Sequence, residues 1–580
     1  MQEPDAASLG SLLTALWQQE GLPRLFALNE AEPSTAEAAR TMDRVLTLVA
    51  AAQAAGKMHD AEGKLSPELL QQLAASGYWG LLVPEEYGGS EARLSQIVPF
   101  LTRLATISPT IAGLQGVHGC IGPVNQLDHF GNDEQCARLL PPLARGERIG
   151  VFGLTEPNAG SDVSQLRTTA VRDGDDYIVT GEKLFITNLL PGRTMGLVCR
   201  IEDQTAVLIV ELPTQETPEF QLTRYGLHSL QHTHNHGVVF CGLRVPAKNR
   251  LDAPLGEGLR IAYHGLNRGR VSLCANAAGT LRAMLAHMLP WVKYRRTFGR
   301  SIGEYQLVER RIGRLAVLSV TAELAARWGA QQLDADERGE AEGIIVKTWA
   351  AEALREAATI LALPTHGGRA FMAGHPWGDH LHDFLAPSIY EGENEILLLA
   401  LFKTASKPHV REFYQPLFAE LEQRGMRNFN PGNPWHVWQL RHVLRPLIRW
   451  RRSQPKFAKG RKHTLDQRLA GCASAIDFLI ATHGAKLAEE QVAMLQVARR
   501  LRTTVIELLL HTAVQEKSPV LQGLDPTLLV LLAEAGLAAE VAGESTPGKL
   551  YAKLGRQILD HGWPALDGIK VSPILRPYDE

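Results

Sequence analysis

The amino-acid sequence predicts an α+β fold that is mostly α, in which a β domain separates two helical domains and a further helical segment follows them. Apolar residues recur at helical spacing over 34–150, the period changes to two over 151–250, and helical spacing returns after 250. The chain of 580 residues is also too long for a single hydrophobic core. These observations divide it into five parts, which are 1–33, 34–150, 151–250, 251–405 and 406–580.

The overall composition is that of an ordinary globular protein. Hydrophobic residues make up 45% and charged residues 21% of the chain, and the formal net charge is −2, so no overall field attracts nucleic acid or a membrane. The six cysteines are scattered without a CxxC pair or a metal-ligand cluster, which is typical of reduced thiols. No basic segment followed by an apolar core opens the chain, and no apolar run approaches the ~18 residues of a membrane span. We expect a cytoplasmic protein without a bound metal.

Residues 1–33 predict a short helix and a proline-containing linker, and 34–150 predict an all-α domain with breaks at VPEEYGG and FGNDEQ. Within TIAGLQGVHGCIGP, glycines recur at three-residue spacing. A glycine inside a helix costs up to ~1 kcal/mol relative to alanine, so this pattern requires a reason. Two reasons stay open, which are close packing of the backbone on a neighbouring helix and a groove left open for a ligand. The glycines are Gly113, Gly116, Gly119 and Gly122.

Residues 151–250 predict a β domain that carries two short motifs. The segments DDYIVTGEKLFITN, TAVLIVEL and HGVVFCGLRVP alternate or run apolar with many β-branched residues. In VFGLTEPNAGSD, Gly160 and Ser161 let the backbone approach a ligand closely, and Thr155 offers a hydroxyl. KLFITN adds the aromatic ring of Phe185. The alternative is that both motifs consist of ordinary hairpin residues.

Residues 251–405 predict two long amphipathic helices joined at FGRSIGEY, followed by the stretch APSIYEGENEILLLALFK. This stretch places the carboxylate of Glu391 between a tyrosine-containing loop and the start of a strongly apolar helix. Desolvation among apolar side chains raises the pKa of a carboxyl and makes it a stronger base, which suits abstraction of a proton from carbon. The alternative is that Glu391 only complements the positive end of a helix.

Four separated stretches resemble signatures of the acyl-CoA dehydrogenase family. They are VFGLTEPNAGSD, KLFITN, the segment from Tyr294 to Gln306, and YEGENEI, and the resemblance extends from about residue 40 to 405. It implies an N-terminal helical domain, a central β domain and a C-terminal four-helix bundle. It also implies α,β-dehydrogenation of a fatty acyl-CoA to a trans-2-enoyl-CoA in fatty acid β-oxidation, with non-covalent FAD and with electrons passed to electron-transfer flavoprotein.

The resemblance assigns roles to individual residues. Glu391 removes the α-hydrogen as a proton while hydride passes from the β-carbon to the flavin. Some family members place the base on the helix after residue 257, but the matching position here is Gly269, so Glu391 is the candidate base. The substrate contacts implied are Ser161, Asn267, Arg270, Tyr390 and Gly392. The FAD contacts implied are Phe152, Leu154, Thr155, Ser161, Phe185, Thr187, Arg295, Phe298, Gln306, Gly367, Gly368, Glu393 and Glu395.

Several positions depart from the family pattern. Phe185 replaces the usual Trp, Pro364 stands where Gln is usual in LPTHGGRAF, and Glu393 replaces the usual Thr after EG. Because EGEN is similar to the EGDN of acyl-CoA oxidases, an oxidase that uses oxygen stays open as an alternative. A catalytically silent flavoprotein or a nucleic-acid binder on this fold is another. The intact Glu391 argues against silence, and the basic part of the chain has no recognisable nucleic-acid fold.

The C-terminal part, 406–580, predicts further helices and a basic segment. No acidic residue occurs between Glu422 and Asp466, and basic residues alternate there with tryptophans and leucines. This pattern is typical of an interfacial helix on anionic lipid, so we expect peripheral contact with the inner face of a membrane through 435–462. A solvated face or a loop for acidic partners are the alternatives. We expect Pro446 to prevent one continuous helix and to open a second.

An extension of this length is similar to that of very-long-chain acyl-CoA dehydrogenases, where it replaces half of the tetramer interface. The resemblance therefore implies a homodimer and a long-chain substrate.

Overall fold

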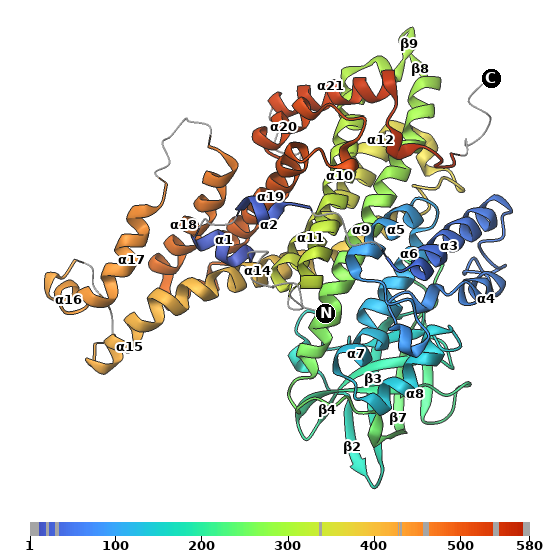
Figure 1. The fold of residues 1–580 in the computed structure, drawn as a ribbon, viewed down its shortest axis with the longest axis horizontal. Coiled ribbons are helices and arrows are strands. Elements are labelled where there is room, and N and C mark those ends of the chain that lie inside the picture. Colours follow the sequence, from blue (N-terminus) through green and yellow to red (C-terminus); the bar gives the residue numbers. More distant parts are fainter. Residues whose placement is uncertain are drawn as a thin grey trace.

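A computed structural model describes most of the chain. The described residues are 11–18, 22–28, 34–335, 339–426, 429, 432–455, 463–537 and 545–571. Figure 1 shows a β-sheet at the bottom, a bundle of long helices above it, and the C-terminal helices beside the bundle. The fold is thus mostly helical with one central β domain, as predicted.

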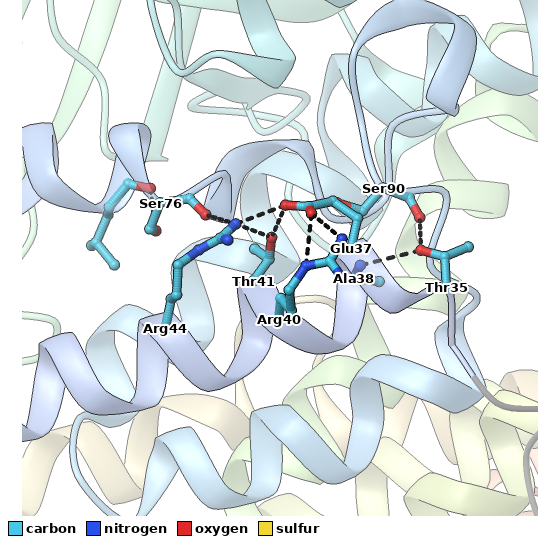
Figure 2. Close-up of polar contacts among 9 residues, drawn as sticks. Thr35, Glu37, Ala38, Arg40, Thr41, Arg44, Ser76 and Ser90 are labelled. Atoms are coloured by element: carbon cyan, nitrogen blue, oxygen red, sulfur yellow. Dashed lines mark hydrogen bonds and ion pairs between the residues drawn. The ribbon is translucent and has the colours of Figure 1, made fainter.

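The N-terminal domain is helical throughout. Its main helices are α3 (Ala36–Ala54), α4 (Pro67–Ala75), α5 (Leu94–Ala105), α6 (Pro109–Gln115), α7 (Pro123–Phe130) and α8 (Asp133–Ala144). Thr35 begins α3, because its hydroxyl accepts a hydrogen bond from the N–H of Ala38 at 3.1 Å (Figure 2). Arg44 then joins α3 to the end of α4, since it donates to Glu37 at 2.8 Å and to the carbonyl of Ser76 at 3.2 Å (Figure 2).

The β domain contains one seven-stranded sheet. Its strands are β1 (Gly150–Gly153), β2 (Thr169–Asp173), β3 (Asp176–Thr187), β4 (Thr194–Ile201), β5 (Gln204–Glu211), β6 (Phe220–Arg224) and β7 (Asn235–Pro246). They lie in the order β1-β4-β2-β3-β7-β6, with β5 paired to β4. The pairing of β3 with β7 is irregular between Lys183 and Ile186, and Phe185 has a left-handed φ of 56° there.

The third domain is the predicted helical bundle. It contains α9 (Gly258–Tyr294), α10 (Gln306–Ala335), α11 (Glu340–Glu356) and α14 (Asn394–His409). The hairpin of β8 (Arg296–Thr297) and β9 (Arg300–Ser301) joins α9 to α10 at the expected position. The short helices α12 (Leu363–His366) and α13 (Leu381–Leu385) precede α14.

The glycine-rich segment packs closely on its neighbours. Residues Gly116–Ile121 form a π-helix, η4, against α9. A Cβ on Gly116 would lie 2.8 Å from the hydroxyl oxygen of Ser272, and a Cβ on Gly119 would lie 2.7 Å from a methyl carbon of Leu82. Close packing therefore accounts for Gly116 and Gly119, whereas a Cβ on Gly113 would make only an ordinary contact of 3.4 Å with Asn276.

Further helices continue from the bundle. The helix α14 runs past position 405 into η11 (Val410–Tyr414) and α15 (Gln415–Gln423), and α16 (Pro434–Gln439) and α17 (Arg441–Ser453) follow. The expectation for Pro446 was wrong, because this residue lies inside α17 and the helical break is at Leu440 instead. Pro446 is the sixth residue of α17 and removes one backbone hydrogen bond, but the buried side chains of Leu444 and Leu447 stabilise the helix across this position. Lys456, Lys459, Arg461 and Lys462 of the basic segment lie outside the described residues.

The last four helices pack back onto the bundle. They are α18 (Leu465–His483), α19 (Gln491–Gln515), α20 (Pro526–Ala535) and α21 (Ser545–His561). α21 crosses α10 at two glycines, Gly313 and Gly555. Beside this crossing, the buried guanidinium of Arg314 binds both carboxylate oxygens of Glu356 at 2.6 and 2.8 Å and the hydroxyl of Tyr551 at 2.7 Å.

The N-terminal segment lies against these added helices. It forms α1 (Leu12–Gln18) and α2 (Leu22–Phe26), whereas the linker expected to end near Glu32 and Pro33 lies outside the described residues. The indole of Trp17 donates to the carbonyl of Ala405 at 2.8 Å and stacks on His409 at 4.2 Å. No helix among the described residues combines the length and the apolar character that crossing a bilayer requires.

Candidate active site

Glu391 lies on a tight turn just before α14. Glu391 and Gly392 both have left-handed backbone conformations, with φ of 56° and 103°. This conformation costs a residue with a side chain on the order of 1 kcal/mol, so the surroundings must hold it in place. α14 begins directly afterwards, where the carboxylate of Glu393 accepts hydrogen bonds from the N–H groups of Glu395 and Ile396 at 2.9 and 3.0 Å.

The carboxylate of Glu391 is buried between α9 and η4. Its Oε2 atom is inaccessible to solvent and has no hydrogen-bond partner among the described residues. A Cβ on Gly269 would lie 3.4 Å from this oxygen and 2.4 Å from a methyl carbon of Ile121, so only glycine fits at 269. Burial raises the pKa of Glu391 to about 7, although the positive charges of Lys347 and Arg270 act in the opposite direction.

Two buried cations hold the turn that carries Glu391. The guanidinium of Arg270 donates to the carbonyl oxygen of Glu391 at 3.2 and 3.3 Å and to the amide oxygen of Asn267 at 2.8 Å. The ammonium of Lys347, on α11, donates to the carbonyl oxygen of Gly392 and to the side-chain oxygen of Asn394. The structure thus brings the predicted residues Asn267, Arg270 and Gly392 together at Glu391.

The other predicted residues near α14 have contacts within the chain. Glu393 begins the helix, and Glu395 forms an ion pair at 2.7 Å with Arg499 of α19. Tyr390 precedes Glu391, and burial raises the pKa of its hydroxyl well above the usual range.

A buried ion pair holds the two motifs of the β domain side by side. The ammonium of Lys183, on β3, donates to the carboxylate of Glu156 at 2.7 Å and to the carbonyl oxygen of Leu154 at 3.0 Å. The next residue, Leu184, donates its N–H to the carbonyl oxygen of Thr155 at 2.9 Å. The strand that carries KLFITN therefore lies directly against the loop that carries TEPNAGSD.

The remaining predicted residues of this domain differ in exposure. Phe152 and Leu154 are buried, Thr155 and Thr187 are half-buried, and Ser161 is exposed. The ring of Phe185 is 59% exposed, so it offers a free aromatic face, and its N–H donates to the hydroxyl of Tyr225 at 2.6 Å.

A groove of about 920 Å³ lies at the other end of the bundle, between the end of α9, the start of α10, and α12. Its lining includes five predicted FAD contacts, which are Arg295, Phe298, Gln306, Gly367 and Gly368. Pro364 also lines it, where the family pattern has glutamine. Phe298 is 97% exposed on the hairpin, which stands at one end of the molecule with the sheet at the other (Figure 1).

The charge of this groove suits a polyanion. Four arginines and no carboxylate belong to the lining residues, and a guanidinium can bind two phosphate oxygens at once. Arg369 also stacks over the indole of Trp291 at 4.0 Å, which fixes the orientation of its side chain. The four arginines are Arg295, Arg300, Arg311 and Arg369.

Sequence reasoning missed Lys347, Lys183 and Glu156. Lys347 is a charged residue in the apolar run IIVKTWAA, and this was the available signal, whereas Lys183 and Glu156 stand inside the two quoted motifs of the β domain without an assigned role. A charged side chain in such a run is buried only if it has a partner, but the sequence does not identify that partner.

Comparison with known proteins identifies the family of this chain. The sequence profiles of the acyl-CoA dehydrogenase N-terminal, middle and C-terminal domains match residues 33–147, 151–242 and 256–405. An acyl-CoA dehydrogenase of Bacillus subtilis is 32% identical over 58% of this chain and 89% of its own length. The chain belongs to the acyl-CoA dehydrogenase family. Members of this family are oxidoreductases that act on CH–CH groups.

One further relative and one solved structure extend the comparison of this acyl-CoA dehydrogenase family member. The rat mitochondrial very long-chain specific acyl-CoA dehydrogenase is 30% identical over 59% of this chain and 53% of its own length. A crystal structure of acyl-CoA dehydrogenase complexed with FAD from Bacillus anthracis has the same fold, with a TM-score of 0.68, 19% identity, and coverage of 91% of this chain and 94% of that one. Coverage of 91% extends beyond residue 405, so the shared fold includes helices of the C-terminal part.

Proposed function

We propose that the protein is an FAD-dependent acyl-CoA dehydrogenase that converts a long-chain fatty acyl-CoA to a trans-2-enoyl-CoA in β-oxidation. One observation carries this proposal, which is the buried Oε2 of Glu391 without a hydrogen-bond partner. A carboxylate that has one oxygen shielded from water and is held on a fixed turn is a strong base aimed at one position. Glu391 therefore takes the α-proton of the thioester. The main-chain N–H of Glu391 is the donor expected to stabilise the negative charge that develops on the thioester oxygen.

The residues present fit FAD. The loop of Leu154 and Thr155, the exposed ring of Phe185 and the nearby Thr187 offer a hydroxyl-lined aromatic surface for the flavin ring. The arginine-lined groove offers donors for the pyrophosphate, with Gln306 and the Gly367–Gly368 backbone beside them. When bound, FAD supplies the acceptor for the hydride that leaves the β-carbon of the substrate. Glu393 and Glu395 are used by contacts within the chain, so we expect them to position α14 rather than to bind FAD.

These two sets of FAD contacts support a homodimer. Gly269 lies beside Glu391, and Arg295 follows 26 residues later, just after the end of α9, which places it about 39 Å further along the helix axis. An FAD molecule whose flavin ring lies beside Glu391 is too short to place its pyrophosphate in the groove of the same chain. A second copy therefore supplies the groove for each FAD, and Phe298, Leu307 and Phe371, which are 97%, 64% and 86% exposed, become covered in the process.

The chain length of the substrate and the electron acceptor belong to the same proposal. The very long-chain specific relative and the added C-terminal helices support a long acyl chain. The glycine-rich segment adds no support, because it is closely packed. Relatives that are named dehydrogenases support transfer of the electrons to electron-transfer flavoprotein.

We also propose that the arm formed by α15, α16 and α17 contacts anionic lipid. Trp435 and Trp438 are 59% and 55% exposed and stack on each other at 5.1 Å, and Ile448 is 40% exposed. Leu444 and Leu447 face inward, so the surface is narrower than the sequence suggested. The exposed arginines Arg441, Arg445, Arg449 and Arg452 lie around it.

The test of the enzymatic proposal is an anaerobic titration with acyl-CoAs of increasing chain length, followed by the absorbance of oxidised flavin. We expect bleaching that is strongest with long chains. Glu391→Gln should retain FAD but reduce the flavin more slowly by about 10²-fold or more, because a general base contributes 10²–10⁴-fold. Undiminished reduction in this variant would exclude Glu391 as the base. Rapid reoxidation on admission of air would identify an oxidase instead.

A further inference from the structure

We propose that Lys347 is a positioning residue for Glu391, which fixes the turn that carries the base and favours the ionised carboxylate. This inference rests on the proposed function, in which Glu391 is the base. Lys347 itself touches neither substrate nor cofactor in this proposal, and it acts through the backbone and the charge of Glu391.

The surroundings of Lys347 require such an explanation. Its side chain is fully buried in α11, yet no carboxylate of the described residues lies within 4.0 Å of its ammonium. A buried ammonium without a direct ion pair costs several kcal/mol unless its hydrogen bonds are satisfied. The partners of Lys347 are the carbonyl oxygen of Gly392 and the side-chain oxygen of Asn394, and both belong to the turn of Glu391.

The turn is held from two sides. Arg270 on α9 binds the carbonyl oxygen of Glu391, and Lys347 on α11 binds the carbonyl oxygen of the next residue, Gly392. Two consecutive carbonyl groups are thus fixed by cations from two different helices. Gly343, one helical turn before Lys347, lets α11 approach α9 closely, since a Cβ there would lie 3.2 Å from the amide oxygen of Asn267. These contacts hold Glu391 in its left-handed conformation and so aim its carboxylate.

The charges around the turn determine the protonation state of Glu391. Burial raises the pKa of Glu391, and Lys347 and Arg270 lower it. Burial also lowers the pKa of Lys347, and the charge of Glu391 raises it, so the two groups titrate as a pair. The other titratable groups that act on this pair or are acted on by it are Arg270 on α9, Glu352 on α11, Glu393 at the start of α14, Tyr390 in the turn and Cys120 in η4.

The test compares pH profiles of variants with FAD bound. Lys347→Met removes the charge and keeps a similar volume, and Lys347→Gln also keeps N–H groups that can bind Gly392. We expect the midpoint of anaerobic flavin reduction against pH to rise by about one pH unit in both, with reduction about fivefold slower at pH 7 and about tenfold slower well below it. Lys347→Arg should restore a midpoint near that of the unchanged protein. Lys403→Met, at an exposed position of α14, is the matched control and should shift nothing.

A second readout separates this inference from the proposed function. The ionisation of Glu391 is followed in the resting holoenzyme by infrared titration, using the carboxyl band that disappears in Glu391→Gln. A higher midpoint of this band in the Met and Gln variants supports the role of Lys347, whether or not any acyl-CoA reduces the flavin. An unchanged band midpoint in Lys347→Gln would overturn it. If no acyl-CoA bleaches the unchanged protein, the proposed function fails while the infrared titration still decides the role of Lys347.

Discussion

Glu391 determines the pH dependence of the proposed reaction. Burial raises its pKa to about 7, and only the ionised carboxylate accepts a proton. The rate of anaerobic flavin reduction should therefore rise with pH through about 7 and level off above it. Because the folded-state pKa lies above that of a free carboxyl, Glu391 contributes folding free energy that is fully present below the free-carboxyl pKa of 4.5 and is lost as pH rises from there to about 7. Stopped-flow reduction between about pH 5 and about pH 9 measures this, and a rate already maximal at about pH 5 would contradict it.

The ion pair of Lys183 and Glu156 is expected to hold the flavin loop in place. Both side chains are buried, with 0% and 4% exposure. Lys183→Met leaves the carboxylate buried without its partner, which costs about 3–5 kcal/mol. We expect a lower Tm and loss of FAD on gel filtration. A combined Lys183→Met and Glu156→Gln variant should recover part of the stability, because the unpaired charge is gone.

The control for this prediction is an exposed ion pair that joins the end of the β domain to α8. Lys248 and Glu134 form a contact of 3.1 Å with 55% and 67% exposure. Lys248→Met should change stability by less than about 1 kcal/mol. Equal losses in Lys183→Met and Lys248→Met would show that burial of the first pair is unimportant.

Sequence reasoning identified the candidate base, but it did not identify Lys347. Glu391 stands in the motif YEGENEI, and Asn267 and Arg270 were assigned to substrate contact by the resemblance, and the structure brings these three residues into one network. Lys347 stands in no motif, and its contact with Gly392 depends on how α11 packs against the turn. Such a contact joins residues 45 positions apart, which local spacing does not predict.

Among the helices, the crossing of α10 and α21 fixes the C-terminal part on the bundle. A Cβ on Gly555 would lie 1.8 Å from the carbonyl oxygen of Glu309, so Gly555→Ala must push the helices apart. We expect a loss of about 1–3 kcal/mol, as is typical of overpacking, and weaker binding of Arg314 to Tyr551. Denaturation with urea measures the loss of stability. Gel filtration shows whether α10 becomes exposed, because an exposed helix surface leads to association of the protein.

A second glycine of α21 supplies the control for the helix crossing. A Cβ on Gly548 would lie 3.5 Å from Arg310, which is an ordinary contact. Gly548→Ala should therefore gain up to ~1 kcal/mol from helix propensity alone. If Gly555→Ala is equally stabilising, the two helices do not approach as closely as described.

The periodicity of the sequence was sufficient to predict which elements form, but not how they dock. The change from helical to alternating spacing and back placed the β domain between helical domains, as observed. The N-terminal helix was also expected, but its burial of Trp17 against Ala405 and His409 was not. The prediction at Pro446 was wrong because packing of Leu444 and Leu447 stabilises the helix across the proline, and the local sequence does not show this packing.

For the whole molecule, the arm of α15–α17 extends away from the bundle and sheet (Figure 1). Its root is firmly held, because Asp477 of α18 accepts hydrogen bonds from Arg451, His409 and Tyr414. An arm held in this way at its root places its exposed tryptophans away from the active-site turn. The net charge of −2 does not favour anionic surfaces, so any such contact must arise from the local arginines.

Binding to lipid vesicles tests the arm. We expect the protein to sediment with vesicles that contain anionic lipid, because each arginine near such a surface contributes about 1 kcal/mol. The binding should weaken as salt is added, because ions screen these charges. Replacing Trp435 and Trp438 by alanine should reduce binding severalfold, since these exposed rings are the apolar part of the contact. Phe478→Ala, a 64% exposed ring on α18, is the matched control. An affinity for DNA that equals the affinity for anionic vesicles, with the same salt dependence, would instead indicate a surface for polyanions in general. Insertion of tryptophan requires a lipid interface, so it would favour vesicles over DNA.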